Sequence, residues 1–371
     1  MIPVCEPSLI GNELEYVTDC VKTNWISSNG AYIERFEEQF SRFCNVKHGV
    51  SCCNGTAAIY LALAAAGIGP GDEVIIPSFT MIASCNAIIY TGAKPVLVDS
   101  DPETWCIDPT KIKEKVTKRT KAIMPVHIYG HPADMDPIND IAEDHNLLVI
   151  EDAAEAHGAE YKGRRCGSLG GMAAFSFYAN KIITCGEGGM VVTDNEEFAE
   201  KMRKLRNHAF GKPRFIHHEL GFNFRITNIQ AAIGCAQMEN ADKLVEMRIR
   251  NAKLYNELLK DVEGVELPPE LPWAKNVYWM YGILLNKRFG ITKDEAMAAL
   301  EKQGVETRSF FYGMNLQPVY HGKDPRFPDV SGSYPVSDDL GKRGLYLPSG
   351  STLTKGQIGE VVEAVRRIRK I

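Results

Sequence analysis

Short apolar runs alternate with helix-like stretches through the first two thirds of the chain. At Ile33, Phe36, Phe40 and Phe43, apolar side chains recur at the spacing of one helix face. Alternation of strands and helices is typical of a mainly parallel sheet covered by helices on both faces, so we expect an α/β fold. The runs that predict buried strands are residues 74–76, 95–98, 122–126, 147–150, 173–177 and 190–192.

The pattern changes in the last third of the chain. A long charged helix is expected over residues 240–259, and a proline-rich passage follows it. The remainder predicts a smaller α+β unit that closes with a helix, for which Thr354 and Gln357 fit a capping box. We therefore predict a large domain over residues 1–245 and a small C-terminal domain over residues 246–371.

Composition and charge exclude several classes of function. The net charge of −5 comes without any basic block, which disfavours nucleic-acid binding because phosphate contacts need clustered Lys and Arg. The longest apolar stretch, near residues 57–67, is too short to span a membrane, and no signal peptide is visible. Ten irregularly spaced cysteines contain no C-x-x-C pair, which predicts reduced thiols in a cytoplasmic protein and no zinc site.

Three stretches of the sequence have the residue types that chemistry needs. In E-D-A-A-E-A-H-G, Asp152 follows an apolar run, at the strand end where open α/β sheets bind ligands. Lys181 stands between two apolar strands and is followed by a glycine-rich turn at 186–189 that lets backbone approach a ligand. The N-G-T at 54–56 joins a strand to a helix start, whose free N–H groups suit a phosphate.

Each of these stretches also has a plain structural interpretation when it is taken alone. Asp152 and Thr56 could simply cap helices, and Lys181 could lie on a surface hairpin. Two common nucleotide-binding motifs are absent from the sequence. The G-I-G-P-G stretch at 67–71 does not match a dinucleotide-binding turn, and there is no P-loop. His127 and His131 would not share a helix face, so we predict no metal site.

Read together, the motifs resemble the DegT/DnrJ/EryC1/StrS family of nucleotide-sugar aminotransferases, and the likeness covers nearly the whole chain. The resemblance implies a fold-type I pyridoxal-phosphate enzyme, with a large α/β domain and a smaller C-terminal α+β domain. The matching stretches are W-I-S-S at 25–28, N-G-T at 54–56, P-S-F-T at 77–80, V-H-I-Y-G at 126–130, E-D-A-A-E-A at 151–156, S-F-Y-A-N-K at 176–181, G-E-G-G at 186–189 and residues 221–234.

The family's catalytic roles map onto three residues of this chain. The resemblance implies that Lys181 carries pyridoxal phosphate as a Schiff base and, once freed by substrate, acts as general base and acid. Asp152 would pair with the pyridine nitrogen, where a carboxylate favours the protonated ring. Glu155 stands where relatives place Gln, His or Glu near the ring's 3-hydroxyl.

The resemblance also implies how the cofactor's phosphate is held. Gly55, Thr56 and Ser176 would bind it within one subunit. Asn223 would reach it from the neighbouring subunit, which makes the active site shared and the enzyme a homodimer.

The expected reaction is transfer of the amino group of L-glutamate to a nucleotide-linked 4-keto-6-deoxy sugar. The stretches at 123–130, 181–190 and 222–234 most resemble members that aminate C4 of GDP-4-keto-6-deoxy-D-mannose to give GDP-perosamine. UDP- or dTDP-linked sugars, amination at C3 and a non-enzymatic regulatory role stay open as alternatives. Sugar dehydration is disfavoured, because dehydratase relatives replace the Schiff-base lysine with His and this chain has Lys181.

Some positions in and near the expected substrate region depart from the family. Met81 replaces an aromatic residue that stacks on the cofactor ring in many relatives, Gly171 replaces Asp, and Asn315 stands where close relatives carry His. The residues that we expect to contact substrate are Trp25, Ser27, Met81, Arg308 and Asn315.

Overall fold

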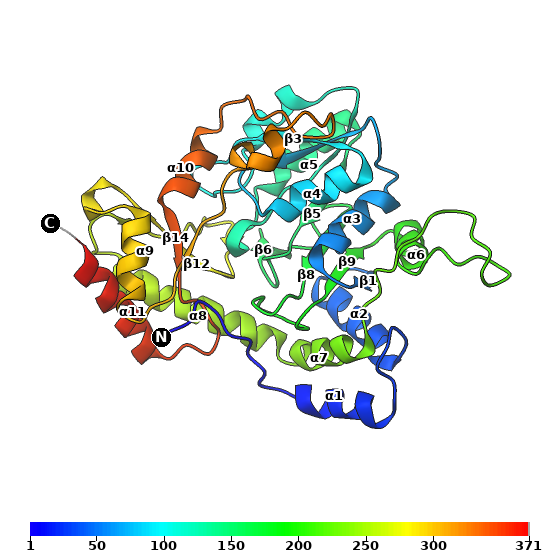
Figure 1. The fold of residues 1–371 in the computed structure, drawn as a ribbon, viewed down its shortest axis with the longest axis horizontal. Helices are drawn as coiled ribbons and strands as arrows, with labels where there is room; N and C mark the ends of the chain where they lie inside the picture. The colour runs from blue at the N-terminus through cyan, green and yellow to red at the C-terminus, as the bar shows by residue number, and fades with distance from the viewer. Residues whose placement is uncertain (370–371) are drawn as a thin grey trace.

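A seven-stranded sheet forms the centre of the larger part of the molecule in the computed structural model, which describes residues 1–369 (Figure 1). Strand β9 alone runs opposite to the others, so the predicted mainly parallel sheet is confirmed. The predicted strands are also confirmed, with shifted ends. In spatial order they are β1 (His48–Cys52), β9 (Gly189–Thr193), β8 (Met172–Ser176), β5 (Leu148–Asp152), β4 (Thr120–Ile123), β2 (Glu73–Pro77) and β3 (Lys94–Val98).

Helices cover both faces of this sheet, and the strand residues alternate between two hydrophobic clusters. In β2, Val74 and Ile76 belong to the cluster that contains α3 (Gly55–Ala65) and α4 (Ile82–Thr91), whereas Ile75 belongs to the opposite one. This alternation follows from the two-residue period of a strand. Both faces are buried, as the continuous apolar runs predict. The remaining covering helices are α2 (Ala31–Phe43), α5 (Met135–His145), α6 (Glu196–Leu205) and α7 (Asn228–Met238).

The C-terminal part forms a second, antiparallel sheet. Its strands lie in the order β10 (Val265–Glu266), β12 (Tyr281–Leu285), β14 (Gly344–Leu347) and β13 (Arg308–Ser309). Its helices are α8 (Ala241–Leu259), α9 (Lys293–Glu301) and α11 (Lys355–Ile368). The capping box of Thr354 and Gln357 at the start of α11 is confirmed.

We propose that the domain boundary lies near residue 245, within α8. Leu244 packs in the core of the large sheet, whereas Tyr255 and Leu259 pack in the core of the small one. The two parts also share packing, because several residues of the C-terminal part lie in the cores of the large sheet, among them Trp279, Phe310, Met314 and Tyr320.

The other elements are peripheral. Helix α1 packs beneath α7, and the segment between α6 and α7 projects from the body (Figure 1). Among the described residues, no helix is long and apolar enough to cross a membrane. These elements are α1 (Glu13–Lys22), α10 (Pro335–Arg343), the three-stranded sheet of β6 (Glu160–Tyr161), β7 (Arg164–Arg165) and β11 (Ala274–Lys275), and 3-10 turns at 109–111, 113–115, 128–130, 287–289, 314–316 and 318–321.

A buried carboxylate fixes the loops around β5. Glu151 accepts hydrogen bonds from His127 Nε2 at 2.9 Å and from the backbone amides of residues 167, 169 and 170 at 2.8 Å each. His127 Nδ1 accepts from the amide of Ala133, so its proton is on Nε2. Glu151, His127 and Cys166 lie close enough to hold a metal ion, but burial raises the pKa of the Cys166 thiol well above its usual range. Because hydrogen bonds occupy the other two side chains, we assign this cluster a structural role.

We predict that Glu151→Ala lowers the free energy of unfolding by about 3–5 kcal/mol, because several buried donors lose their acceptor at once. Urea unfolding followed by circular dichroism measures the change. The control is Glu38→Ala, which removes a carboxylate from the surface and is expected to cost below about 0.5 kcal/mol. Equal losses in the two variants would show that the Glu151 network contributes nothing.

Candidate active site

A pocket of about 510 Å³ opens where β5 and β8 end and α3 begins. This is the carboxyl edge of the sheet, where ligands bind in open α/β folds. The pocket brings together eight of the residues singled out from sequence. These are Gly55, Thr56, Met81, Asp152, Glu155, Ser176, Lys181 and Arg308.

Lys181 lies in the irregular segment between β8 and β9, and its amine is enclosed. Its Nζ is 3.6 Å from the ring centroid of Trp279 and 4.0 Å from Glu155 Oε1. Burial lowers the pKa of Lys181, which the nearby carboxylates partly offset. Trp279 is fixed by a hydrogen bond from Nε1 to the carbonyl of Asn180. An enclosed amine of lowered pKa is suited to nucleophilic attack on a carbonyl.

Asp152 ends β5, with its carboxylate buried in the pocket. Ser84 Oγ donates to Oδ2 at 2.6 Å, and the amide of Ala154 donates to Oδ1 at 3.2 Å. Burial raises the pKa of Asp152, and these two hydrogen bonds act against the rise. A carboxylate in this position can hold a proton on a ligand nitrogen.

Glu155 lies beside Lys181 and is held by a strained backbone. The amide of Tyr129 donates to Oε2 at 2.7 Å, and Tyr129 has a φ of 53°, in the left-handed region that non-glycine residues seldom occupy. Burial raises the pKa of Glu155 from 4.5 to about 7, so its charge changes near neutral pH.

The start of α3 forms a cradle suited to a phosphate. Asn54, not Thr56, caps the helix, because its side chain accepts from the amide of Ala57. The first amides of a helix have no partner within it, which leaves those of Gly55 and Thr56 for an anion. A Cβ on Gly55 would lie 2.7 Å from Cβ of Ser176, so glycine is needed for α3 to approach Ser176 this closely.

The other predicted site residues lie outside this pocket. Trp25, Ser27 and Asn223 are exposed. Asn315 is buried, and its amide group is bonded within the chain: Oδ1 accepts from Ser78 Oγ at 2.6 Å, and Nδ2 donates to Asp338 at 2.9 Å.

Several residues of the pocket were not singled out from sequence. Thr80 belongs to the P-S-F-T stretch, and Ser84 follows it four residues later. This spacing of about one helical turn is the feature of the sequence that could have identified Ser84 as a pocket residue. Trp279 and Tyr346 come from the C-terminal part, in stretches without a recognisable motif. Only the folded chain brings them to Lys181.

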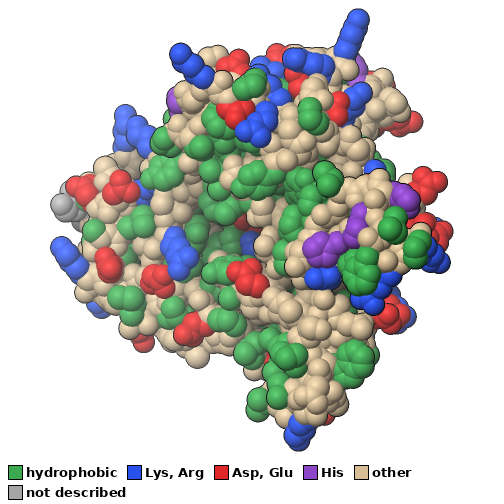
Figure 2. Space-filling model, turned by 45° about the vertical axis from the view of Figure 1, so that its right-hand side comes forward, with side chains coloured by type: hydrophobic (Ala, Val, Ile, Leu, Met, Phe, Trp, Pro, Cys, Tyr) green, Lys and Arg blue, Asp and Glu red, His purple; other side chains and the backbone are tan. Residues whose placement is uncertain are grey.

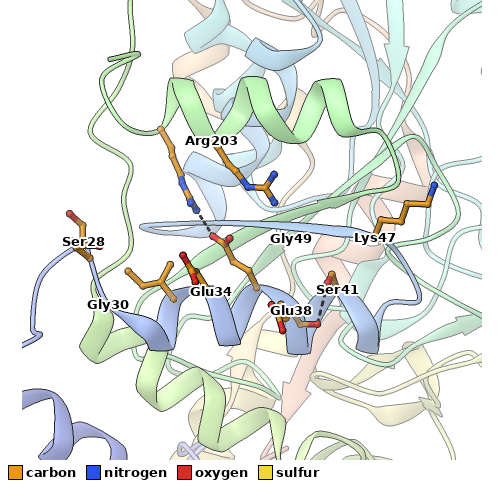
Figure 3. A pocket seen from close by; sticks show the side chains of 12 residues that line it. Ser28, Gly30, Glu34, Glu38, Ser41, Lys47, Gly49 and Arg203 are labelled. Atoms are coloured by element: carbon orange, nitrogen blue, oxygen red, sulfur yellow. Dashed lines mark hydrogen bonds and ion pairs between the residues drawn. The ribbon is translucent and has the colours of Figure 1, made fainter. Parts of the chain in front are cut away.

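A second hollow, of about 380 Å³, lies between α2 and α6 (Figure 3). Glu34 and Glu38 point into it from α2, and Arg203 faces them from α6 (Figure 3). Within it, Glu37 and Arg206 form an ion pair with each other at 2.5 Å. The charges of the acidic and basic side chains compensate for one another in this hollow. None of the residues that we singled out as catalytic or ligand-binding candidates lines it.

Comparison with known proteins agrees with this geometry. The model of the DegT/DnrJ/EryC1/StrS aminotransferase family matches residues 7–366, and the chain belongs to this family. A protein of Caulobacter vibrioides named GDP-perosamine synthase is 46% identical over 99% of this chain and 98% of that one. One of the same name from Escherichia coli O157:H7 is 42% identical over 98% and 97%. The solved structure of DesV from S. venezuelae, in complex with a ketimine intermediate, has a TM-score of 0.90 and 36% identity over 97% and 95% of the two chains.

The protein is therefore a pyridoxal-phosphate-dependent sugar aminotransferase of fold type I, and the predicted fold class, enzyme class and cofactor are confirmed. The pocket residues fit this cofactor. The pocket offers an enclosed lysine amine, a buried carboxylate and a helix N-terminus that has no side chain at Gly55. These are the groups that an aldehyde, a pyridine nitrogen and a phosphate need.

We predict that Glu155 makes the cofactor-free enzyme less stable as pH rises. Since its pKa is about 7 when folded and 4.5 otherwise, the folded chain holds a proton that the unfolded chain releases between these values. The stabilisation is complete below about pH 4.5 and is lost as pH rises through 7. Urea unfolding midpoints should fall over this range, and Glu155→Gln should flatten the fall. Glu187→Gln, at an exposed position of the same pocket, is the control and should keep the wild-type slope.

Proposed function

We propose that this enzyme transfers the amino group of L-glutamate to C4 of GDP-4-keto-6-deoxy-D-mannose and so forms GDP-perosamine. The observation that carries the proposal is the 46% and 42% identity, over almost full length, to two proteins named GDP-perosamine synthase. UDP- and dTDP-linked keto sugars, and amination at C3, are the alternatives that the experiment below separates.

The proposed roles of the pocket residues follow from their positions. Pyridoxal phosphate supplies an electron sink and a carrier for the amino group. Lys181 Nζ would act as the base that takes the proton from the α-carbon of the amino donor, and as the acid that delivers it again within the same half-reaction. It would run the reverse shift to place a proton on the aminated carbon of the sugar, because no other amine lines the pocket among the described residues. Asp152 would hold a proton at the ring nitrogen, and Glu155 would lie near the 3-hydroxyl. Glutamate and the keto sugar use the same pocket in turn.

The phosphate is held at the start of α3 in this proposal. The amides of Gly55 and Thr56 and the hydroxyl of Ser176 converge there, and the positive end of the helix dipole adds to their attraction for an anion. Asn223 is exposed and has no place in its own subunit's pocket, so its proposed phosphate contact requires a second subunit.

A homodimer is also supported by the surface around the site. Figure 2 shows a hollow near the middle of one face, with apolar side chains around it. Met81 and Tyr178, both pocket residues, are 47% and 48% exposed. Contiguous exposed apolar surface of this kind is typical of an interaction site.

The substrate contacts remain proposals. Arg308 lines the pocket and is held by Glu306 at 3.2 Å, so its guanidinium is placed for an anionic group of a substrate. Met81 lines the same pocket. Trp25 and Ser27 lie outside it, so we propose that they meet substrate in the neighbouring subunit's pocket.

We predict that only the GDP-linked 4-keto-6-deoxy sugar is aminated efficiently with glutamate in a panel of GDP-, UDP- and dTDP-linked sugars. Mass spectrometry and NMR identify the product and the aminated carbon. Lys181→Ala should lose activity and the visible band of the bound cofactor. Lys181→Arg, which keeps the charge but cannot form the imine, should lose both as well. A UDP or dTDP product, or a C3 amine, would overturn the proposed substrate and leave the enzyme class intact.

We predict that two inactive variants restore activity when their subunits mix. A heterodimer of Lys181→Ala and Asn223→Ala chains has one pocket with both Lys181 and the neighbouring Asn223. Random pairing therefore gives roughly a quarter of the wild-type activity, and the isolated heterodimer, with one working pocket of two, gives roughly half. Co-expression with two affinity tags isolates the heterodimer, and a mixture of two Lys181→Ala preparations is the control. No recovery, with heterodimer formation verified, would exclude a site completed by Asn223.

A further inference from the structure

We propose that Ser84 and Thr80 are positioning residues for Asp152. They keep its side chain ionised and orient the carboxylate toward the place of the cofactor's ring nitrogen. The inference rests on the proposed role of Asp152. Its basis is a chain of short hydrogen bonds, with Thr80 Oγ1 2.8 Å from Ser84 Oγ and Ser84 Oγ 2.6 Å from Asp152 Oδ2. All three side chains are buried, and all three line the pocket.

The direction of the protons along this chain is fixed by the carboxylate. An ionised Asp152 can only accept hydrogen bonds, so Ser84 must donate its single hydroxyl proton to it. Ser84 can then only accept from Thr80, which becomes the donor of the second bond. Each bond strengthens the next one, and the chain as a whole favours negative charge on Asp152.

The surroundings show why such support is needed. Burial raises the pKa of Asp152 and so favours its neutral form, which could not hold a proton on the ring nitrogen. The charged and titratable groups that act on Asp152 are Lys181, Glu155 and His127. Lys181 attracts Asp152 only while its amine is charged, and Glu155 repels Asp152 when ionised. His127 is bonded on both ring nitrogens, by the amide of Ala133 and by Glu151. The Ser84 hydrogen bond does not depend on the charge of these three groups.

The loop that carries both hydroxyls is itself anchored. Ser78 donates to Asn315 Oδ1, and the amide of Met314 donates to the carbonyl of Ser78 at 2.8 Å. Beyond it, Thr80 precedes α4 and Ser84 lies in its first turn. The bond from Met314 involves only the backbone of residue 78, so it holds this segment in place without the Ser78 hydroxyl. The hydroxyl gives buried Asn315 a partner at a distance from the pocket.

The test is nitrogen-15 NMR of the holoenzyme, loaded with pyridoxal phosphate labelled at the ring nitrogen. Its chemical shift reports whether that nitrogen is protonated. Ser84→Ala should lower the pH at which the ring loses its proton by about one to two units, the equivalent of one hydrogen bond to a charged group. Thr80→Val should shift it in the same direction but less. Ser84→Thr keeps the hydroxyl and should restore the wild-type midpoint.

Two control variants separate the role of Ser84 from loop damage and from the proposed role of Asp152. Ser78→Ala removes a buried hydroxyl from the same loop without touching Asp152, so loop damage alone should leave the titration unchanged. Asp152→Asn should abolish ring protonation. If it does not, the proposed role of Asp152 is wrong. If it does, but Ser84→Ala and Thr80→Val titrate as wild type, the inference is overturned while the proposed function stands. Should Ser84→Ala fail to fold, Thr80→Val decides the question.

Discussion

The structure depends on keeping two opposite charges, those of Lys181 and Asp152, inside one pocket. Removing an ionisable group from water is costly unless hydrogen bonds and an opposite charge compensate for it. The chain provides both kinds of compensation: Ser84 and the amide of Ala154 bond Asp152, and the carboxylate of Glu155 lies 4.0 Å from the amine of Lys181. The Trp279 ring also lies against this amine. The sheet determines where this happens, because Asp152 and Ser176 end adjacent strands.

Much of the fold could be predicted from the chain's own pattern. Apolar runs with helical stretches between them are specific to a covered, mainly parallel sheet, and the capping box at Thr354 marks its helix without ambiguity. Strand ends were less accurate. The run at 122–126 forms a strand only over Thr120–Ile123, since Pro125 cannot donate a ladder hydrogen bond.

The site was predictable where motif and strand end coincide, and less so elsewhere. Asp152, Lys181 and Ser176 belong to motifs in consecutive stretches, and they line one pocket. Asn54 and Thr56 are both good caps by residue type, so only the backbone shows that Asn54 accepts the bond. Tyr129 contributes its backbone amide, which donates to Glu155, and Trp279 contributes its ring, which lies against Lys181. The residue type alone predicts neither the direction of an amide nor the position of a ring. The hydrogen bonds of Asn315 were not predictable either, because its partners come from residues 78 and 338, far away in the sequence.

Helix α8 has a consequence for how the molecule denatures. Its 19 residues form one rod of about 28 Å that contributes side chains to the hydrophobic cores beside both sheets. Melting either core leaves half of this rod without packing, and a helix of that length is marginal by itself in water. Thermal unfolding of the two cores is therefore coupled, and calorimetry of a single subunit should record one cooperative heat-absorption peak and not two.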